Sequence, residues 1–232
     1  MEITTENYKI RRIAILGGTG KEGKGLAYRW AGNGLEIIIG SRQQEKALAA
    51  ADEVNALLGT GGKPVVGKTN DIAAREADLL VVTVPFSAHK TMLESIKELA
   101  QGKILIDVTV PLVPPRVTRV QMPAEGSSAL EAQAILGPEV QVVDAFQNIS
   151  YERLMQSGDV GCDVLVCGGN KEARSVVLEL VKCAGLTGWD AGPIENAVVV
   201  EGLTSVLIGI NKQFGIHSAG IRISGVNDSN EN

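Results

Sequence analysis

The sequence predicts an α/β fold: a doubly wound parallel sheet, followed by a small C-terminal α/β portion that ends in a long apolar helix. Short, almost wholly apolar runs alternate with longer amphipathic runs through the first half of the chain. A glycine-rich turn joins the first apolar run to the first amphipathic run, and residues 196–214 are nearly uncharged. Continuous apolar strands that alternate with helices are typical of a parallel sheet covered on both faces.

The expected elements follow the order of these runs. Strands are expected at 13–16, 35–39, 64–66, 79–84, 104–108, 140–143 and 162–166. Helices are expected at 22–31, 43–58, 87–100, 129–136, 171–183 and 196–214, with a proline-rich loop at 111–123 and a turn at 190–193. The last helix is apolar around most of its circumference, which predicts deep burial, with part of it free to face a second subunit.

Composition narrows the class of protein. The formal net charge is −5, the basic residues are scattered and aromatic residues make up 3%, which excludes a nucleic-acid-binding surface. The first 12 residues are polar and no apolar run reaches the roughly 18 residues of a membrane span, so we expect a cytoplasmic protein without membrane contact. Cys162, Cys167 and Cys183 match no metal-site spacing; we expect them to be buried and expect no metal site.

The glycine-rich turn has the spacing of a dinucleotide-binding motif. Six consecutive residues fit G-x-G-x-x-G: Gly18, Thr19, Gly20, Lys21, Glu22 and Gly23. They follow an expected strand and open an expected helix, so the glycines permit close approach of a pyrophosphate to backbone N–H groups at the helix start. The sequence therefore predicts a Rossmann-type nucleotide-binding fold.

The end of the second strand selects the cofactor. A site for NAD places an acidic residue about 20 residues beyond the glycines, where it accepts from the ribose 2′-hydroxyl. Here Ser41 and Arg42 stand at that point, and the first carboxylate is Glu45. Arg42 can pair with a 2′-phosphate, Ser41 adds a donor, and Lys46 lies one helical turn further on. The pattern favours NADP(H); the alternative is that Arg42 and Lys46 are solvated charges.

Two residues after the fourth strand are further candidates. Phe86 is expected to pack near the cofactor, with a place in the core as the alternative, because strand ends at the switch point line the nucleotide crevice. His89 is expected on an exposed helix face, with a general-acid role as the less favoured reading. No triad, metal cluster or carboxylate pair is evident, so no catalytic residue is assigned.

The motifs together resemble the coenzyme F420-dependent NADP oxidoreductases. The similar stretches run almost from end to end of the chain: 15–20, 23–25, 40–42, 46, 82–85, 190–193, 201–204 and 220–223. The resemblance implies reversible hydride transfer between NADP(H) and the deazaflavin F420, in which the cofactors carry the chemistry and the protein positions them. It also implies a nucleotide-binding domain at 1–150, a small domain at 151–232 that completes the deazaflavin pocket, and a homodimer.

By resemblance, the cofactor-binding residues are those named above: the glycine motif, Ser41, Arg42, Lys46 and Phe86. The positions that correspond to the family's deazaflavin pocket are Gln147, Ile149, Gly202, Thr204 and Ala219. Gln147 stands where the family carries a histidine, and Gly202 where it carries a serine. Arg116 and Arg119 are candidate partners for the phosphate and glutamate tail of F420, the alternative being loop solubility.

Two other functions fit the same residues. One is an NADPH-dependent reductase of another acceptor, such as a flavin, an imine or a metal complex. The other is a non-enzymatic NADP sensor, which would bind NADPH without turnover. Anaerobic turnover with F420 separates these readings from the first.

Overall fold

The structure is a computed structural model in which residues 1–155 and 160–226 are described. The strands are β1 (Ile3–Thr4), β2 (Lys9–Ile10), β3 (Arg12–Leu16), β4 (Glu36–Ser41), β5 (Val66–Thr69), β6 (Leu79–Val82), β7 (Ile104–Asp107), β8 (Gln141–Asp144), β9 (Asp163–Gly168) and β10 (Thr187–Gly192). The helices are α1 (Lys21–Gly32), α2 (Gln44–Leu58), α3 (Asn70–Glu76), α4 (Phe86–Ala100), α5 (Ser128–Leu136), α6 (Tyr151–Leu154), α7 (Lys171–Cys183) and α8 (Ala197–Phe214), with a 3-10 turn, η1, at Ile194–Asn196.

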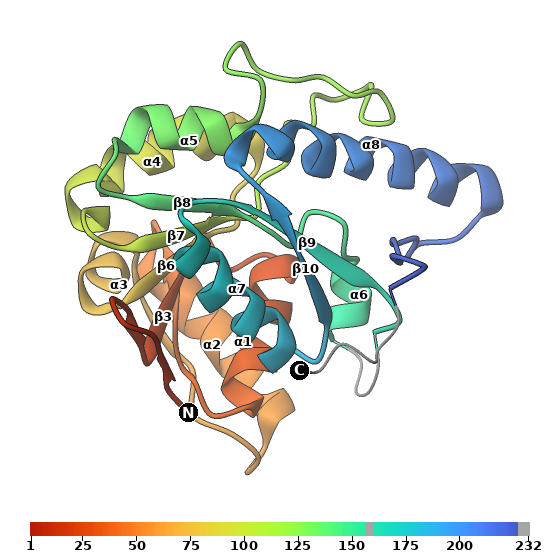
Figure 1. Cartoon of the computed structure of the whole chain (residues 1–232). Coiled ribbons are helices and arrows are strands. Elements are labelled where there is room, and N and C mark those ends of the chain that lie inside the picture. The colour runs from red at the N-terminus through yellow and green to blue at the C-terminus, as the bar shows by residue number, and fades with distance from the viewer. Residues whose placement is uncertain (156–159, 227–232) are drawn as a thin grey trace.

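Eight strands form one sheet in the order β10-β9-β8-β7-β6-β3-β4-β5 (Figure 1). The six strands from β8 to β5 are parallel, β9 pairs antiparallel with β8, and β10 is parallel to β9. The chain leaves β3 toward β4 and later places β6 on the other side of β3, which makes the β3–β6 boundary the switch point. The predicted doubly wound α/β sheet is confirmed; the antiparallel joint to β9 was not predicted.

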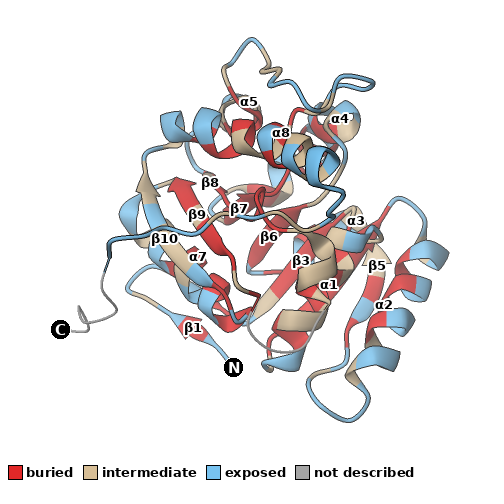
Figure 2. Cartoon of the chain, turned by 90° about the vertical axis from the view of Figure 1, so that its right-hand side faces the viewer, coloured by how far each residue is buried: buried red, intermediate tan, exposed pale blue. Residues whose placement is uncertain are grey.

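Helices cover both faces of this sheet (Figure 1). One face packs on α1, α2 and α7 and the other on α3, α4, α5 and the first turn of α8, each with its own buried apolar cluster. Figure 2 shows the buried strands between these helical layers. Strands buried on both faces have few positions for polar residues, which explains the continuous apolar runs of the sequence.

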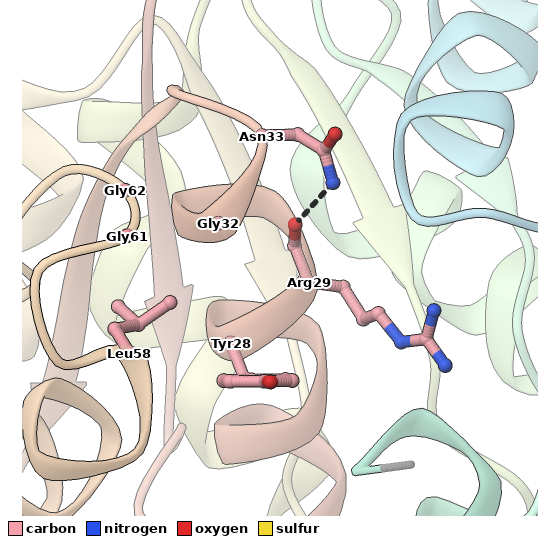
Figure 3. A pocket seen from close by; sticks show the side chains of 7 residues that line it. All are labelled: Tyr28, Arg29, Gly32, Asn33, Leu58, Gly61 and Gly62. Atoms are coloured by element: carbon pink, nitrogen blue, oxygen red, sulfur yellow. Dashed lines mark hydrogen bonds between the residues drawn. The ribbon is translucent and has the colours of Figure 1, made fainter. Parts of the chain in front are cut away.

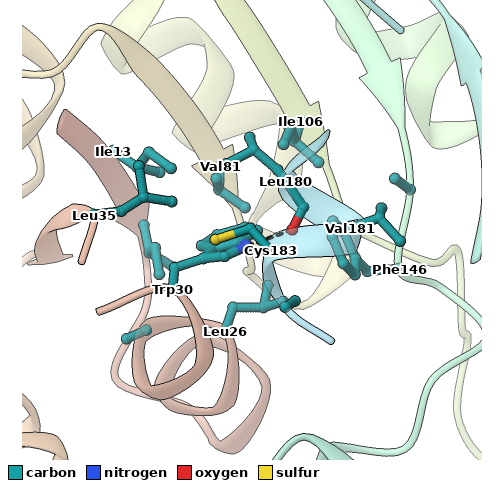
Figure 4. Close-up of a cluster of buried hydrophobic side chains, with 14 of the residues drawn as sticks. Ile13, Leu26, Trp30, Leu35, Val81, Ile106, Phe146, Leu180, Val181 and Cys183 are labelled. Atoms are coloured by element: carbon teal, nitrogen blue, oxygen red, sulfur yellow. Dashed lines mark hydrogen bonds between the residues drawn. The ribbon is translucent and has the colours of Figure 1, made fainter. Parts of the chain in front are cut away.

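Trp30 anchors the larger cluster (Figure 4). Its ring is fully buried, and its indole N–H donates to the Leu180 carbonyl at 2.9 Å, which satisfies the polar atom and ties α1 to α7. The Phe146 ring meets it edge to face, with centroids 5.7 Å apart. Phe146 adopts a φ of +76°, a left-handed conformation rare for a bulky residue. This contact fixes the loop that follows β8.

Several elements differ from the sequence expectations. The strand expected at 64–66 is β5, at Val66–Thr69, and the expected turn at 190–193 overlaps β10, which runs to Gly192. The short helix α3 and the β1–β2 hairpin were not expected. The three cysteines are buried and free, and residues 111–123 form a loop, both as predicted.

The prediction that α8 is deeply buried is wrong. Its apolar side chains do not all face the protein: Val199 is 61% exposed, Val206 49% and Phe214 67%. Figure 2 shows exposed positions along the outer side of this helix. By length and composition, Ile194–Phe214 is also the one helix of the described residues that could cross a membrane, contrary to the sequence expectation, although core helices of soluble proteins meet the same criteria.

Candidate functional site

A cleft of about 810 Å³ opens where β3, β4 and β6 end, at the switch point of the sheet. One wall comes from the glycine turn, the end of β4 and the start of α2, and the other from the turn after β6 and from α4. The lining residues are Gly17, Thr19, Ser41, Arg42, Gln43, Lys46, Asn70, Val84, Pro85, Ser87, Ala88, Thr91, Met92 and Ser95.

Packing requires two of the motif glycines. A Cβ on Gly18 would lie 2.6 Å from the Ile15 carbonyl oxygen, and a Cβ on Gly23 would lie 2.6 Å from the Gly18 Cα. The Gly18 N–H donates to the Gly40 carbonyl at 3.0 Å, which joins the turn to β4. Gly18 and Gly23 therefore allow the close crossing of α1 over β3.

Gly20 has a different role, because a Cβ there would meet no atom within 4 Å. It is the N-cap of α1 and provides no side-chain cap. The first N–H groups of a helix lack intrahelical partners and carry the positive end of the helix dipole. The start of α1 thus offers donors to an anion in open space.

The residues predicted to choose between NADP and NAD lie together on one wall of the cleft. Ser41 is buried at the end of β4, and its hydroxyl accepts from the Gln43 N–H at 3.3 Å. Arg42 and Lys46 are exposed, and among the described residues neither makes an ion pair within 4 Å. Two cations and one hydroxyl on the same wall have the chemistry that a doubly charged phosphate requires of its binding site.

Asn70 is a cleft residue that the sequence reasoning missed. Its side-chain oxygen accepts from the Gly17 N–H at 3.1 Å, and Gly17 has a φ of +66°. Asn70, the first residue of α3, thus holds the start of the glycine turn in place. The available signal was a polar residue shortly after a short strand, but the strand expected at 64–66 ends three residues earlier than β5, so Asn70 did not stand out as a strand-end residue.

Lys21 and Glu22 lie in the motif but not among the lining residues. The Lys21 ammonium donates to the Tyr151 hydroxyl at 2.8 Å and lies 4.4 Å from the centre of that ring; this hydrogen bond raises the pKa of Lys21. Burial raises the pKa of the Glu22 carboxyl to about 8, and its Oε1 has no hydrogen-bond partner. Phe86, at the start of α4, is half-buried and stacks on His89 rather than lining the cleft.

The structure links two of the five residues expected in the acceptor pocket. The Thr204 hydroxyl donates to the Gln147 carbonyl at 2.9 Å. Ile149 packs in the apolar cluster of α1 and α7, and a Cβ on Gly202 would face Met122 at 3.4 Å. The Ala219 N–H donates to the Asn211 side chain at 2.9 Å.

Asn148, which the sequence reasoning did not single out, is 4% exposed. Its amide donates to the Val200 carbonyl at 3.0 Å and to the Thr204 hydroxyl at 3.3 Å. The amide oxygens of Gln147 and Asn148 are both buried without a hydrogen-bond partner. Arg116 and Arg119 are exposed in the proline-rich loop, where the Arg119 carbonyl accepts from the Ser205 hydroxyl of α8 at 3.3 Å.

His89 is fully buried, so the expectation of an exposed histidine is wrong. Its Nε2 lies 2.7 Å from Asp107 Oδ2 and its Nδ1 lies 3.0 Å from Glu131 Oε1. Burial opposes the charged ring, but Asp107 and Glu131 outweigh it and raise the pKa of His89 to about 9. Helical spacing alone could not reveal this, because both partners are distant in sequence.

Two more carboxyls are buried beside Asp107. Glu201 of α8 accepts from the N–H groups of Ser128 and Ala129 at 2.8 and 3.0 Å, and so caps α5. Burial raises the pKa of Glu201 to about 7. Burial also raises the pKa of Asp144 well above its usual range. In residues 1–155 and 160–226, no group of three or more His, Cys, Asp or Glu side chains is arranged to hold a metal ion.

A second, smaller hollow of about 430 Å³ lies at the opposite end of α1 (Figure 3). It is lined by Tyr28, Arg29, Gly32, Asn33, Leu58, Gly61 and Gly62. The Asn33 amide donates to the Arg29 carbonyl at 3.0 Å. This hollow lies at the C-terminal end of the helix, where the dipole disfavours anions, and it contains none of the predicted site residues.

Known proteins share both the sequence and the fold. The family model "NADP oxidoreductase coenzyme F420-dependent" matches residues 12–111. The chain is 39% identical over 220 residues to the F420-dependent NADP reductase of Methanocaldococcus jannaschii, which covers 92% of this chain and 98% of that protein. It is 31% identical over 194 residues to the metalloreductase STEAP3 of Rattus norvegicus, covering 83% of this chain and 36% of that protein.

A crystal structure of a putative F420-dependent NADP reductase from Arthrobacter sp. FB24 superposes with a TM-score of 0.77 at 24% identity. The superposition covers 93% of this chain and 100% of the other. That likeness concerns the fold, while the near-complete match at 39% identity fixes the family. The resemblance drawn from the motifs is confirmed: this chain belongs to the F420-dependent NADP oxidoreductase family.

Proposed function

We propose that this chain catalyses reversible hydride transfer between NADP(H) and coenzyme F420. The observation that carries the proposal is the cleft at the switch point, which the glycine turn before α1 lines together with Arg42 and Lys46. The M. jannaschii relative, named for the same pair of cofactors, supports the choice of F420.

Different residues of the cleft bind different parts of NADP(H). The N–H groups at the start of α1 donate hydrogen bonds to the pyrophosphate oxygens, and Gly20 leaves room for them. Ser41, Arg42 and Lys46 bind the 2′-phosphate. The nicotinamide end then lies toward Val84 and the first turns of α4, whose apolar and hydroxyl side chains exclude water.

On the acceptor side, we assign Gln147, Ile149, Gly202, Thr204 and Ala219 to the deazaflavin pocket, with Arg116 and Arg119 facing its anionic tail. The buried, unpartnered oxygens of Gln147 and Asn148 support a polar ligand there, since buried acceptors seldom lack donors. Once both rings are bound, hydride passes from one to the other and the protein contributes alignment.

Anaerobic mixing with NADPH and F420, followed by the loss of deazaflavin absorbance, tests this function. We expect turnover with NADPH and much less with NADH. As controls, free flavin, an imine and ferric citrate each replace F420 as the electron acceptor in the same buffer. Turnover with one of these but not with F420 would defeat the proposal, and NADPH binding without any turnover would favour a sensor.

A metal-complex reductase is the second candidate. It rests on the similarity to STEAP3, a metalloreductase, of which this chain spans about a third. The absence of a metal-ligand cluster in the described residues is compatible with it, because a metal complex would then be a substrate. Ferric citrate in the assay above distinguishes the two.

We further propose that the protein is a cytoplasmic homodimer without membrane or nucleic-acid contacts. The exposed apolar residues of α8 (Val198, Val199, Val206, Ile210 and Phe214) support a second copy as the partner of that face. We also propose that residues 1–150 bind the nucleotide and residues 151–232 complete the acceptor pocket.

A further inference from the structure

We propose that His89 is a positioning residue for hydride transfer: clamped as an imidazolium between Asp107 and Glu131, it fixes the wall of the cleft against which the nicotinamide end of NADP(H) lies. This inference rests on the proposed function for its kinetic consequence. The charge state and the clamp are properties of the protein alone.

His89, Asp107 and Glu131 form a cluster, called the His89 cluster below. Each ring nitrogen lies within 3.0 Å of a carboxylate oxygen. A neutral imidazole has one N–H and one lone pair, so only the imidazolium donates from both nitrogens. The His89 and Asp107 side chains are fully buried, and Glu131 is 16% exposed.

The charges around the His89 ring are mostly negative. Asp107 faces His89 from β7 and Glu131 faces it from α5. Asp144 of β8 and Glu201 of α8 interact electrostatically with Asp107. Among the described residues, His89 is the single cation that makes an ion pair with any of these four carboxyls. A neutral ring would leave Asp107 buried without a counter-charge, which is costly.

Helix α4 connects the His89 cluster to the cleft. On α4, the residues Ser87, Ala88 and Thr91 line the cleft while His89 points into the protein. The Phe86 ring stacks on His89 with centroids 6.1 Å apart. The His89 clamp therefore sets the position of the first turns of α4.

Asp107 extends the connection to both predicted sites. Its Oδ1 accepts from the Thr109 N–H at 3.0 Å, and the Thr109 hydroxyl donates to the carbonyl of Val84, a cleft residue, at 3.5 Å. The carbonyl of Asp107 accepts from the Gln147 amide at 2.6 Å. One residue thus joins the nucleotide cleft to the expected acceptor pocket, where small displacements change the distance between the reacting rings.

The first measurement is the ¹⁵N NMR spectrum of the histidine rings. The chain has two histidines, and His217 is exposed, so the His217→Gln variant assigns the His89 signals and serves as the matched control. We expect both His89 nitrogens to be protonated at pH 7.5. A neutral ring at that pH, with the proton on Glu131 or Asp107, would overturn the imidazolium assignment.

The second measurement uses His89→Gln with NADPH deuterated at the transferred position. We expect kcat to fall by about 10- to 100-fold, with a kinetic isotope effect that becomes more temperature-dependent, while the Kd for NADP⁺ changes much less. His217→Gln should match the wild type. A folded His89→Gln enzyme with unchanged kcat and isotope effect would overturn the positioning role.

If His89→Gln does not fold, Glu131→Gln removes one partner at the less buried end. We expect the remaining imidazolium to titrate at lower pH and kcat to fall part of the way. An unchanged titration would contradict the clamp. Absence of F420 turnover in the wild type would instead contradict the proposed function, while the NMR result would still decide whether the clamp exists.

Discussion

Arg42 stands after β4 at the position where an NAD-specific site carries a carboxylate, and it lies in the cleft with Ser41 and Lys46. An exposed arginine usually has no specific binding role. Here it is unpaired among the described residues and lies beside a second cation and a hydroxyl. A 2′-phosphate bound as proposed would receive charge-assisted hydrogen bonds from both cations.

Replacing Arg42 with alanine should therefore raise the KM for NADPH by about 10- to 100-fold, since such bonds contribute roughly 1.5–3 kcal/mol. The KM for NADH, which lacks the phosphate, should hardly change. Steady-state kinetics with both cofactors checks this, and Arg75→Ala on the exposed surface of α3 is the control. Equal losses for NADPH and NADH would count against a 2′-phosphate site.

Asp144 gives a prediction about pH. Its folded pKa lies well above the ordinary value because the carboxyl is buried. Below the ordinary value both folded and unfolded chains hold the proton. As pH rises above it, the unfolded chain releases its proton first, so the wild type loses stability until pH passes the folded pKa.

Asp144→Asn removes this titration and keeps an acceptor for the Gln147 amide. We expect its free energy of unfolding to be within about 1 kcal/mol of the wild type at pH 4, and to gain on the wild type as pH rises to 8. Urea denaturation at both pH values measures this, with Asp52→Asn on the exposed side of α2 as control. A constant difference at both pH values would show that Asp144 is ionised in the folded protein.

At the scale of the element, α1 combines two functions in one turn. One glycine allows the helix to pack closely on β3. Another leaves open space in front of the helix start, where an anion can approach. Gly23 is needed for packing, whereas Gly20 has open space around it and a φ of −75° that any residue can adopt.

Gly20→Ala should accordingly leave the melting temperature almost unchanged and weaken NADP⁺ binding, because the methyl group would occupy the open space in which we propose that the pyrophosphate binds. Gly23→Ala is the counterpart: its Cβ collides with the Gly18 backbone, and overpacking of this kind costs about 1–3 kcal/mol or more. Calorimetry of binding and of unfolding separates the two effects. Loss of stability in Gly20→Ala without loss of affinity would reverse the assignment.

At the scale of the whole molecule, α8 covers one end of a sheet yet leaves an apolar side uncovered. If that side binds a second copy, a charge placed there should separate the subunits. We expect Val206→Glu to convert a dimer into a monomer in sedimentation velocity experiments. Val66→Glu, at a similarly exposed valine on β5, should remain dimeric. A monomeric wild type would refute the dimer.

The sequence predicts those parts of the fold and of the candidate site that depend on neighbouring residues. It does not predict those that depend on contacts between residues far apart in the chain. The glycine motif and Ser41-Arg42 are local patterns, and both were placed correctly at the end of a strand. The environment of His89 depends on Asp107 and Glu131, 18 and 42 residues away. The pairing of β10 with β9 and the exposed side of α8 are likewise set by tertiary packing, which a helical or strand period does not encode.

The antiparallel joint between β8 and β9 has a consequence for motion. Its register contains two residue pairs, Val143 with Gly168 and Asp144 with Cys167, whereas β7 and β8 share four. Local opening costs less where fewer hydrogen bonds must break, so this joint should open before the rest of the sheet. Amide hydrogen exchange should therefore be faster at Gly168 than at Ile106. The pair β9-β10 should move relative to the six parallel strands, with the short β8–β9 pairing as the point of bending.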